Sequence, residues 1–253
     1  MRPVELAFQL VELLSLHQPV GVGQLARLAD IPKSTAQRTL HALKKTGWVE
    51  PSAGDRPLWR LTMRALVASG RANLEHRSLR SLALPVMEEL RRATEETVHL
   101  TCRFQNILVL VERLDGIKPV RYFFPYGGTS NLHSTATGKA ILASLPQIEL
   151  DEFLGRPLRT LTTHTLTDPD ALRRDLAQAR ERGYAVNLGG NIANVHGVGA
   201  AILDPDGRPF SALSVSAPSD RFPVELAERF GPLVADAARR VSLGVASQPA
   251  LAV

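Results

Sequence analysis

The stretch that decides the fold reads IPKSTAQRTLHALKKTGWV and covers residues 31–49. Proline favours the first turn of a helix, and no further helix breaker follows Pro32 until Gly47. Ala36, Leu40 and Leu43 are spaced at i, i+4 and i+7, so they share one face of a helix. The pattern therefore predicts a helix of roughly 13 residues, about 20 Å long.

The outer face of this predicted helix carries cations and hydrogen-bonding groups and no acid. Arg, Lys and Gln read base edges in the major groove of DNA, and Ser and Thr contact phosphates. The alternative is the solvated face of an ordinary surface helix. If the helix binds DNA, the residues that we expect to contact it are Lys33, Ser34, Thr35, Gln37, Arg38 and His41.

Neighbouring segments favour DNA binding. Residues 23–29 predict a short helix, and a turn of about three residues joins it to the basic helix, which is the arrangement of a helix-turn-helix. Downstream, the β-prone residues 48–50 and 58–61 flank the turn-rich segment 51–56, a pattern typical of a hairpin wing. Arg56, at the tip of the wing, is a candidate contact to a phosphate or the minor groove, and a solvated loop arginine is the alternative.

These residues carry a resemblance to a known family. The run from Ala7 to Gly70 resembles the winged helix-turn-helix domain of the IclR family of bacterial transcriptional regulators. The matching residues are Ala7-Phe8, Leu25-Ala26, Ile31-Pro32-Lys33-Ser34-Thr35, Arg38, Leu40, Leu43, Gly47 and Arg60-Leu61. IPKST followed by xxRxLxxLxxxG is a specific pattern and not a generic helix signal.

The positive charge of the chain lies in its N-terminal part. Residues 1–77 hold 11 Lys and Arg against 6 Asp and Glu, whereas the remaining 176 residues hold 19 of each. Because affinity for nucleic acid depends largely on neutralising phosphates, this asymmetry favours a DNA-binding N-terminal domain joined to a neutral partner domain.

Other features of the composition concern the compartment. The 253 residues contain no apolar run of 18 or more and no N-terminal apolar core, so we expect neither a membrane span nor a signal peptide. The single cysteine, Cys102, excludes an internal disulfide and favours a reducing cytoplasm, with a buried thiol as its expected role.

The order of predicted elements indicates an α+β fold. We expect a winged helix-turn-helix domain at 1–61, a linker helix at 62–77, a C-terminal domain at 78–246 with an antiparallel sheet flanked by helices, and a loose tail at 247–253. In the C-terminal domain we expect helices at 78–95, from about 135, at 169–182 and at 223–245, and strands at 97–104, 107–114, 120–124, 184–188, 198–203 and 210–216.

The second half extends the resemblance to nearly the whole chain. Residues 132–140, LHSTATGKA, look like the family's LHATAxGKA signature, and 182–185 match its RGYA. Residues 198–202 and 214–218 are similar to its closing strands. Membership would imply a GAF-like effector domain, dimers or tetramers, and DNA binding modulated by a small metabolite.

The resemblance also implies an effector pocket. Carried over by position, its residues are Ala136, Thr137, Asn187, Gly197, Ser214 and Ser216, and we expect Tyr126 and His133, beside Phe124, to line the same space. Ser214 and Ser216 share one face of a strand, and with the amides of a helix N-terminus they would form a carboxylate site. A serine pair on a solvated face is the alternative.

Three positions depart from the family pattern, namely Asn187, Gly197 and His196, the last of which has no family counterpart. Many members carry an acid at the position of Asn187 and a cysteine at or beside that of Gly197. Loss of the acid would make the pocket less hostile to anions or leave it unable to bind the usual ligand. A glycine would give room for a bulkier, aromatic effector. An organic or aromatic acid is the effector class that we expect.

Signatures of catalysis are absent from the sequence. Its seven histidines form no HxxxH or HExxH pair, and no GxSxG, Walker or GxGxxG loop occurs, so we expect no enzyme, metal or cofactor. The favoured function is a metabolite-responsive regulator that binds a palindromic operator. The alternatives are a constitutive DNA-binding architectural or interaction protein, whose C-terminal domain serves only assembly, and an enzyme fused to a DNA-binding domain.

Overall fold

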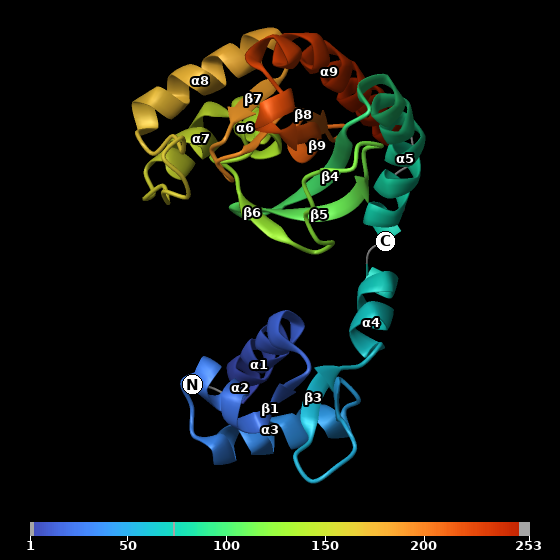
Figure 1. The fold of residues 1–253 in the computed structure, drawn as a ribbon, viewed down its shortest axis with the longest axis vertical. Helices are drawn as coiled ribbons and strands as arrows, with labels where there is room; N and C mark the ends of the chain where they lie inside the picture. Colours follow the sequence, from blue (N-terminus) through green and yellow to red (C-terminus); the bar gives the residue numbers. More distant parts are fainter. Residues whose placement is uncertain (1–2, 73, 248–253) are drawn as a thin grey trace. The chain divides into compact units, whose positions relative to one another are not determined.

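The computed structural model describes residues 3–72 and 74–247, and the chain divides into two compact units, Met1–Leu74 and Glu75–Val253. We call these the N-terminal unit and the C-terminal unit and describe each by itself (Figure 1). Among the described residues, no helix combines the length and the apolar character needed to cross a bilayer. The predicted loose tail lies outside the described residues, apart from Ser247.

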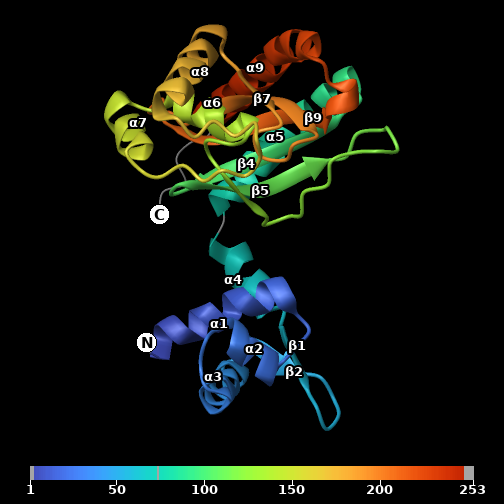
Figure 2. The same ribbon diagram turned by 60° about the vertical axis from the view of Figure 1, so that its left-hand side comes forward.

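The N-terminal unit is a winged helix-turn-helix, as predicted. A three-stranded antiparallel sheet of order β1-β3-β2 packs beside its helices (Figure 2). The core joins α1, α2 and α3 to the sheet through Leu10, Leu25, Leu40 and Trp59. The elements are α1 (Pro3–His17), β1 (Val20–Gly21), α2 (Val22–Leu28), α3 (Lys33–Lys45), β2 (Val49–Pro51), β3 (Leu58–Leu61) and α4 (Arg64–Ala72).

The turn between α2 and α3 and the end of α3 have local causes. Asp30 adopts a positive φ of 51°, a conformation that Asp tolerates better than most residues, and the amide of Ile31 donates to the carbonyl of Ala26 at 3.0 Å. Helix α3 ends at Lys45, Gly47 follows its C-cap residue with a φ of 79°, and the amide of Trp48 donates to the carbonyl of Leu43 at 2.9 Å. A glycine in this left-handed conformation is a common helix terminator.

The C-terminal unit is built on a six-stranded antiparallel sheet of order β6-β5-β4-β9-β8-β7. Its elements are α5 (Leu74–Thr94), β4 (Thr97–Phe104), β5 (Ile107–Leu114), β6 (Thr129–Asn131), α6 (Ala136–Ser144), α7 (Gln147–Leu154), α8 (Pro169–Arg182), β7 (Ala185–Leu188), β8 (Val195–Leu203), β9 (Pro209–Pro218) and α9 (Val224–Ala246), with a short 3₁₀ turn at Ser219–Arg221. The linker helix expected at 62–77 covers α4 and the start of α5, and residue 73 between them lies outside the described residues.

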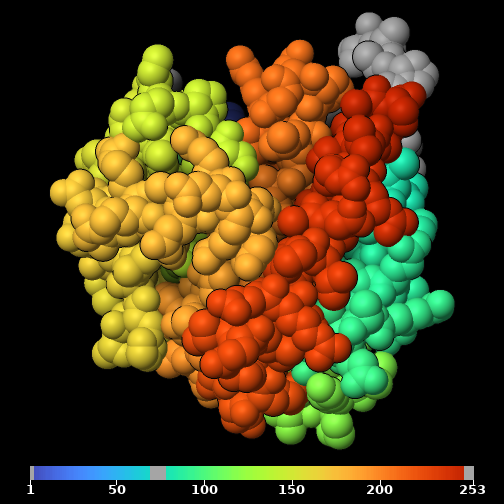
Figure 3. Space-filling model, turned by 90° about the horizontal axis from the view of Figure 1, so that it is seen from above, coloured from blue at the N-terminus to red at the C-terminus, as the bar shows by residue number. Residues whose placement is uncertain are grey.

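Helices cover both faces of this sheet. One core packs α5 and α9 against the apolar side chains of β4, β8 and β9, among them Leu100, Val198 and Leu213. A second core joins α6, α7 and α8 on the other side through Leu142, Leu154, Leu172 and other residues. Figure 3 shows α9 lying between α8 and α5 on the outer surface. Side chains alternate between the two faces along β4, β8 and β9. Those that do not enter the core with α5 and α9 therefore point toward α6.

One expectation for the C-terminal unit is wrong, and one helix was not expected. Residues 120–124 form no strand, because the edge of β5 is already occupied by β6, with Ile107 opposite Asn131, and by hydrogen bonds between Leu110 and residues 127 and 128. The aromatic run gave a β signal, but Phe123 is 67% exposed instead of packing in a sheet. Helix α7 was not predicted, although Leu150, Phe153 and Leu154 form its buried face.

Helix α6 lies unusually close to its neighbours because two glycines permit it. A Cβ atom on Gly199 of β8 would come within 2.7 Å of the carbonyl carbon of Ala136. A Cβ atom on Gly138 would collide with the backbone of Leu132. The glycine in the segment 132–140 is thus a packing requirement that lets the first turn of α6 lie against the backbone of Leu132, while Gly199 lets the start of the helix lie on the sheet.

We expect Gly138→Ala to destabilise the protein by about 2 kcal/mol, because the added methyl group overpacks the site. Helix propensity alone would give the opposite sign, since alanine is better than glycine in a helix by about 1 kcal/mol. Gly155→Ala is the control, as its Cβ would meet its first neighbour at an ordinary 3.5 Å. Urea unfolding followed by circular dichroism measures both, and a Gly138→Ala variant as stable as the wild type would refute the close contact.

Candidate functional site

The first candidate site is the outer face of α3. Lys33, Ser34, Gln37 and Arg38 are exposed and Thr35 is half-buried. Their positions are held by the opposite face, because Ala36 and Leu40 have no exposed surface. Within the described part of the chain, neither Lys33 nor Arg38 forms an ion pair with a carboxylate. The face therefore presents free cations and hydrogen-bonding groups.

The wing extends this surface. The exposed residue His41 of α3 lies against Trp59 of β3 in an edge-on ring contact with centroids 5.8 Å apart. Arg60 pairs with Glu50 across the hairpin at 2.8 Å, and Arg56 is exposed at the tip. His41 thus connects the helix to the wing, and the surface from α3 to the wing tip can receive an anionic polymer such as the DNA backbone.

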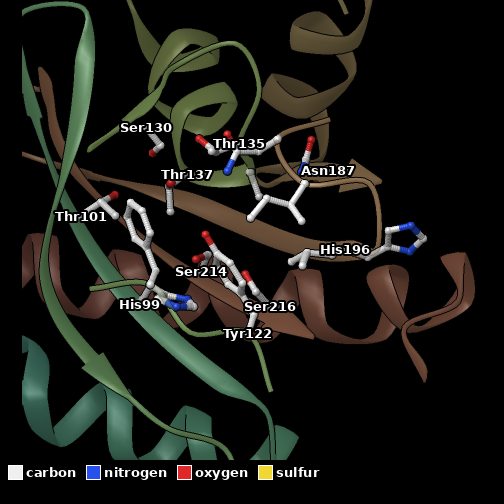
Figure 4. A pocket seen from close by; sticks show the side chains of 16 residues that line it. His99, Thr101, Tyr122, Ser130, Thr135, Thr137, Asn187, His196, Ser214 and Ser216 are labelled. Atoms are coloured by element: carbon white, nitrogen blue, oxygen red, sulfur yellow. The ribbon is translucent and has the colours of Figure 1, made fainter. Parts of the chain in front are cut away.

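The second candidate site is a cavity of about 60 Å³ in the C-terminal unit. Its floor is the face of β4, β8 and β9 that points toward α6. Its other sides are the start of α6, the segment after β5 and the loop after β7 (Figure 4). Its lining residues are His99, Thr101, Tyr122, Phe124, Ser130, Thr135, Ala136, Thr137, Asn187, Asn191, Ile192, Val195, His196, Gly197, Ser214 and Ser216.

The floor of the cavity follows from strand register. Ser214 of β9 lies opposite His99 of β4 on one side and opposite Gly199 of β8 on the other. Ser216 lies opposite Gly197 in the same way. Glycines on β8 leave space for the start of α6 and for the serine side chains, so the two hydroxyls line an open space beneath the helix.

The start of α6 supplies hydrogen-bond donors. The N-cap residue Thr135 accepts a hydrogen bond from the amide of Gly138 at 3.1 Å. The amides of Ala136 and Thr137, in the first turn, have no carbonyl partner inside the helix, and both residues line the cavity. Free amides at a helix N-terminus, together with the positive end of the helix dipole, favour an anion.

Two buried side chains on the floor have polar atoms without a partner. Within the described residues, Nε2 of His99 and Oγ1 of Thr101 form no hydrogen bond, although each residue is only 4% exposed. Burial, with the positive charge of Arg113 as the second cause, lowers the pKa of His99 to about 4. The imidazole is therefore neutral at neutral pH.

An aromatic wall closes one side of the cavity. Tyr122 stacks on Phe124 with ring centroids 6.1 Å apart and contacts His99 at 5.7 Å. The segment that carries these two rings is held at its start by an ion pair. Lys118 pairs at 3.2 Å with Glu96, which is 1% exposed. The wall is suited to a flat, partly apolar ligand.

The structure brings together six of the eight expected effector residues. Ala136, Thr137, Asn187, Gly197, Ser214 and Ser216 all line the cavity. Tyr126 and His133 do not, which corrects our expectation for them. The Tyr126 hydroxyl donates to Glu112 at 2.6 Å, and Nε2 of His133 is 2.9 Å from the carbonyl oxygen of Arg159. His133 lines a separate cavity beside α8.

The expected extra room at Gly197 is also corrected. A Cβ atom at this position would lie 2.8 Å from Oγ of Ser216, so the serine already uses that space. His99, Thr101 and Tyr122 line the cavity although the sequence patterns did not predict them. The alternation of Thr97, His99 and Thr101 with apolar residues was the available signal, because it places three polar groups on one strand face.

The cysteine lies outside the cavity. Cys102 faces the core beneath α5 and α9, and burial raises its pKa to about 11. A thiol with a raised pKa is a poor nucleophile, which agrees with the expected buried role.

Comparison with known families matches both units. The model of the IclR helix-turn-helix domain matches residues 3–53, and the model of the bacterial transcriptional regulator IclR C-terminal domain matches residues 71–243. The transcriptional repressor IclR of Escherichia coli K12 is 30% identical over 227 residues, covering 88% of this chain and 82% of that protein. The repressor AllR of the same organism is 32% identical over 232 residues, covering 90% and 85%. Both relatives are regulators and not enzymes.

Solved structures agree with these relatives. The IclR of Thermotoga maritima is 26% identical, with a TM-score of 0.75 and coverage of 96% of this chain and 98% of that one. An IclR homolog from Microbacterium hydrocarbonoxydans, solved in complex with 4-hydroxybenzoate, is 26% identical, with a TM-score of 0.83 and coverage of 98% and 100%.

The buried His99 predicts a pH dependence of stability. Because its pKa falls from 6.5 to about 4 on folding, only the unfolded chain takes up the proton between these values. The free energy of unfolding should therefore decrease as the pH falls through this window, by up to roughly 3 kcal/mol, with no contribution above it.

Urea unfolding between about pH 7.5 and about pH 5 measures this effect against His99→Leu, which removes the titrating group. The same replacement at the exposed His164 is the control. A stability difference between wild type and His99→Leu that does not change with pH would contradict a buried neutral imidazole.

Proposed function

This chain belongs to the IclR family of bacterial transcriptional regulators, and on that premise we propose how its two units act. It is an IclR-type regulator with a helix-turn-helix domain and an effector-binding domain. We propose that the N-terminal unit binds a palindromic operator, that the C-terminal unit binds an organic or aromatic acid, and that the acid changes DNA binding or activation.

The exposed face of α3 supports the assignment to DNA. In a helix-turn-helix the second helix enters the major groove, and α3 presents Lys33, Ser34, Gln37 and Arg38 on the side away from the core. Thr35 and His41 flank this face, and Arg56 at the wing tip would reach the backbone or the minor groove. Arg38 is central on this face and suits a bidentate contact to guanine.

The arrangement around the start of α6 is the single observation that carries the effector proposal. Two amides without helical partners, at Ala136 and Thr137, lie above the hydroxyls of Ser214 and Ser216, in a cavity with an aromatic wall. No acid lines this cavity among the described residues, since Asn187 stands where many members carry one. The complex of the Microbacterium homolog with 4-hydroxybenzoate supports an aromatic acid for this chain as well.

Exposed apolar residues of the N-terminal unit support self-association. Phe8 and Leu16 of α1 are 62% and 76% exposed, and Leu66 of α4 is 62% exposed. A two-fold axis would cover such residues and present two α3 helices to a palindrome. We therefore propose a homodimer or homotetramer, which light scattering on the purified protein would test.

We expect Arg38→Ala to weaken operator binding by about 1–3 kcal/mol, roughly 5- to 150-fold, through loss of one bidentate base contact. The promoter region of the regulated genes serves as the labelled operator DNA. Fluorescence anisotropy on this DNA gives the Kd. Arg174→Ala removes the same charge from an exposed position on α8 and is the matched control. Equal Kd values for Arg38→Ala and the wild type, with both proteins folded, would refute the assignment.

We expect an acid from a panel of aromatic and aliphatic carboxylates to raise the Tm of the chain, because a ligand that binds only the folded state stabilises it. Ser214→Ala should weaken binding of that acid about tenfold through loss of a hydrogen bond to the carboxylate. Ser144→Ala, on α6 but outside the cavity, is the control.

A panel in which no acid shifts the Tm would argue against an acid effector. Operator affinity that no bound acid alters would instead favour the alternative of a constitutive DNA-binding protein whose C-terminal unit serves only assembly.

A further inference from the structure

We propose that the cavity selects a monocarboxylic acid that carries an uncharged hydroxyl or carbonyl group at the far end of a flat body, and that Thr101 and His99 recognise this second group. The inference rests on the proposed function, since it concerns the same cavity, and it deepens that function by naming the ligand class and two specificity-determining residues.

The unpartnered atoms of Thr101 and His99 are the first argument. Both side chains are buried and line the cavity, yet Oγ1 of Thr101 and Nε2 of His99 have no hydrogen-bond partner within the described residues. A buried polar group without a partner is costly, so such groups are normally satisfied by the protein, by water or by a ligand. A ligand that offers a polar atom at this end would satisfy them.

Strand register places Thr101 one step further from the carboxylate end than His99. Ser214, beneath the start of α6, lies opposite His99, whereas Thr101 lies opposite Ala212, one step further along the same face. Diagonal neighbours of this kind are about 7–8 Å apart. A ligand whose acid group contacts Ser214 and the α6 amides would therefore place its other end near Thr101, across about the length of one substituted ring.

The surroundings of the far end disfavour a second negative charge. The groups available there are a hydroxyl and a neutral imidazole. Arg113, opposite His99 on β5, is already paired with Asp115 at 2.8 Å and also donates to the carbonyl oxygen of Phe124. A second carboxylate would lose its hydration without gaining a free cation. The stacked rings of Tyr122 and Phe124 favour a flat body between the two ends.

Isothermal titration calorimetry on the full chain tests the proposal with benzoate, 4-hydroxybenzoate and terephthalate. All three share a ring and a carboxylate and differ only in the group at the far end. We expect 4-hydroxybenzoate to bind at least about tenfold more tightly than benzoate, because its hydroxyl satisfies a buried polar atom, and terephthalate to bind most weakly.

Variants assign the preference to its residues. Thr101→Val is nearly isosteric and should remove most of the preference for 4-hydroxybenzoate while leaving the affinity for benzoate within about threefold. His99→Leu, of similar volume, should act in the same direction. Thr97→Val makes the same change on the same strand face, but Oγ1 of Thr97 accepts from the amide of Gly116 at 3.3 Å and does not line the cavity. This control should keep the wild-type preference.

The possible results distinguish the preference for a second polar group from acid binding itself. Equal affinities for benzoate and 4-hydroxybenzoate, or a preference that survives Thr101→Val, would overturn the inference while leaving acid binding intact. Tighter binding of terephthalate would overturn the uncharged second group. Failure of all three acids to bind would count against the proposed aromatic-acid function itself, and the inference would fall with it.

Discussion

The C-terminal unit depends on the close contact between α6 and β8. Gly199 on the strand allows the backbone of the helix start to lie against it, where any side chain would collide. This contact brings the start of the helix, with its unpaired amides, down to the floor of the cavity. The same contact leaves the adjacent strand β9 free to present two serine hydroxyls beside the helix. The site is therefore a consequence of tight packing and not of a loop that closes over a ligand.

Alternation along β4, β8 and β9 divides structural from chemical roles. One side of each strand contributes Leu100, Val198 and Leu213 to the core under α5 and α9. The other side contributes His99 and Ser214 to the cavity. Because a shift of register by one residue would exchange the two sides, the apolar core also fixes which polar groups face the cavity. Hydrophobic burial thus positions the polar residues that would recognise a ligand.

The N-terminal unit uses a helix in the same two-sided way. Ala36 and Leu40 are fully buried, and this orients Arg38 toward the outside. The contact between His41 and Trp59 joins the helix to the wing, so that two separate elements form one continuous surface. In both units a rigid element is fixed by its apolar face and presents chemistry on the other, as a binding site on a stable scaffold requires.

The sequence by itself determined the fold class, the basic helix α3 with its wing, the paired strands β4 and β5, and six cavity residues known through the resemblance. It succeeded where the signal is local, because capping residues, breakers and periodicity act within one element. Only the tertiary structure decided that 120–124 is a wall and not a strand, that Tyr126 and His133 lie outside the cavity, and that His99 and Thr101 lie inside it. Those outcomes depend on which strand occupies the edge of β5 and on how distant segments pack. The alternation of His99 and Thr101 with apolar residues shows that they share a strand face, but it does not show that this face lines a cavity.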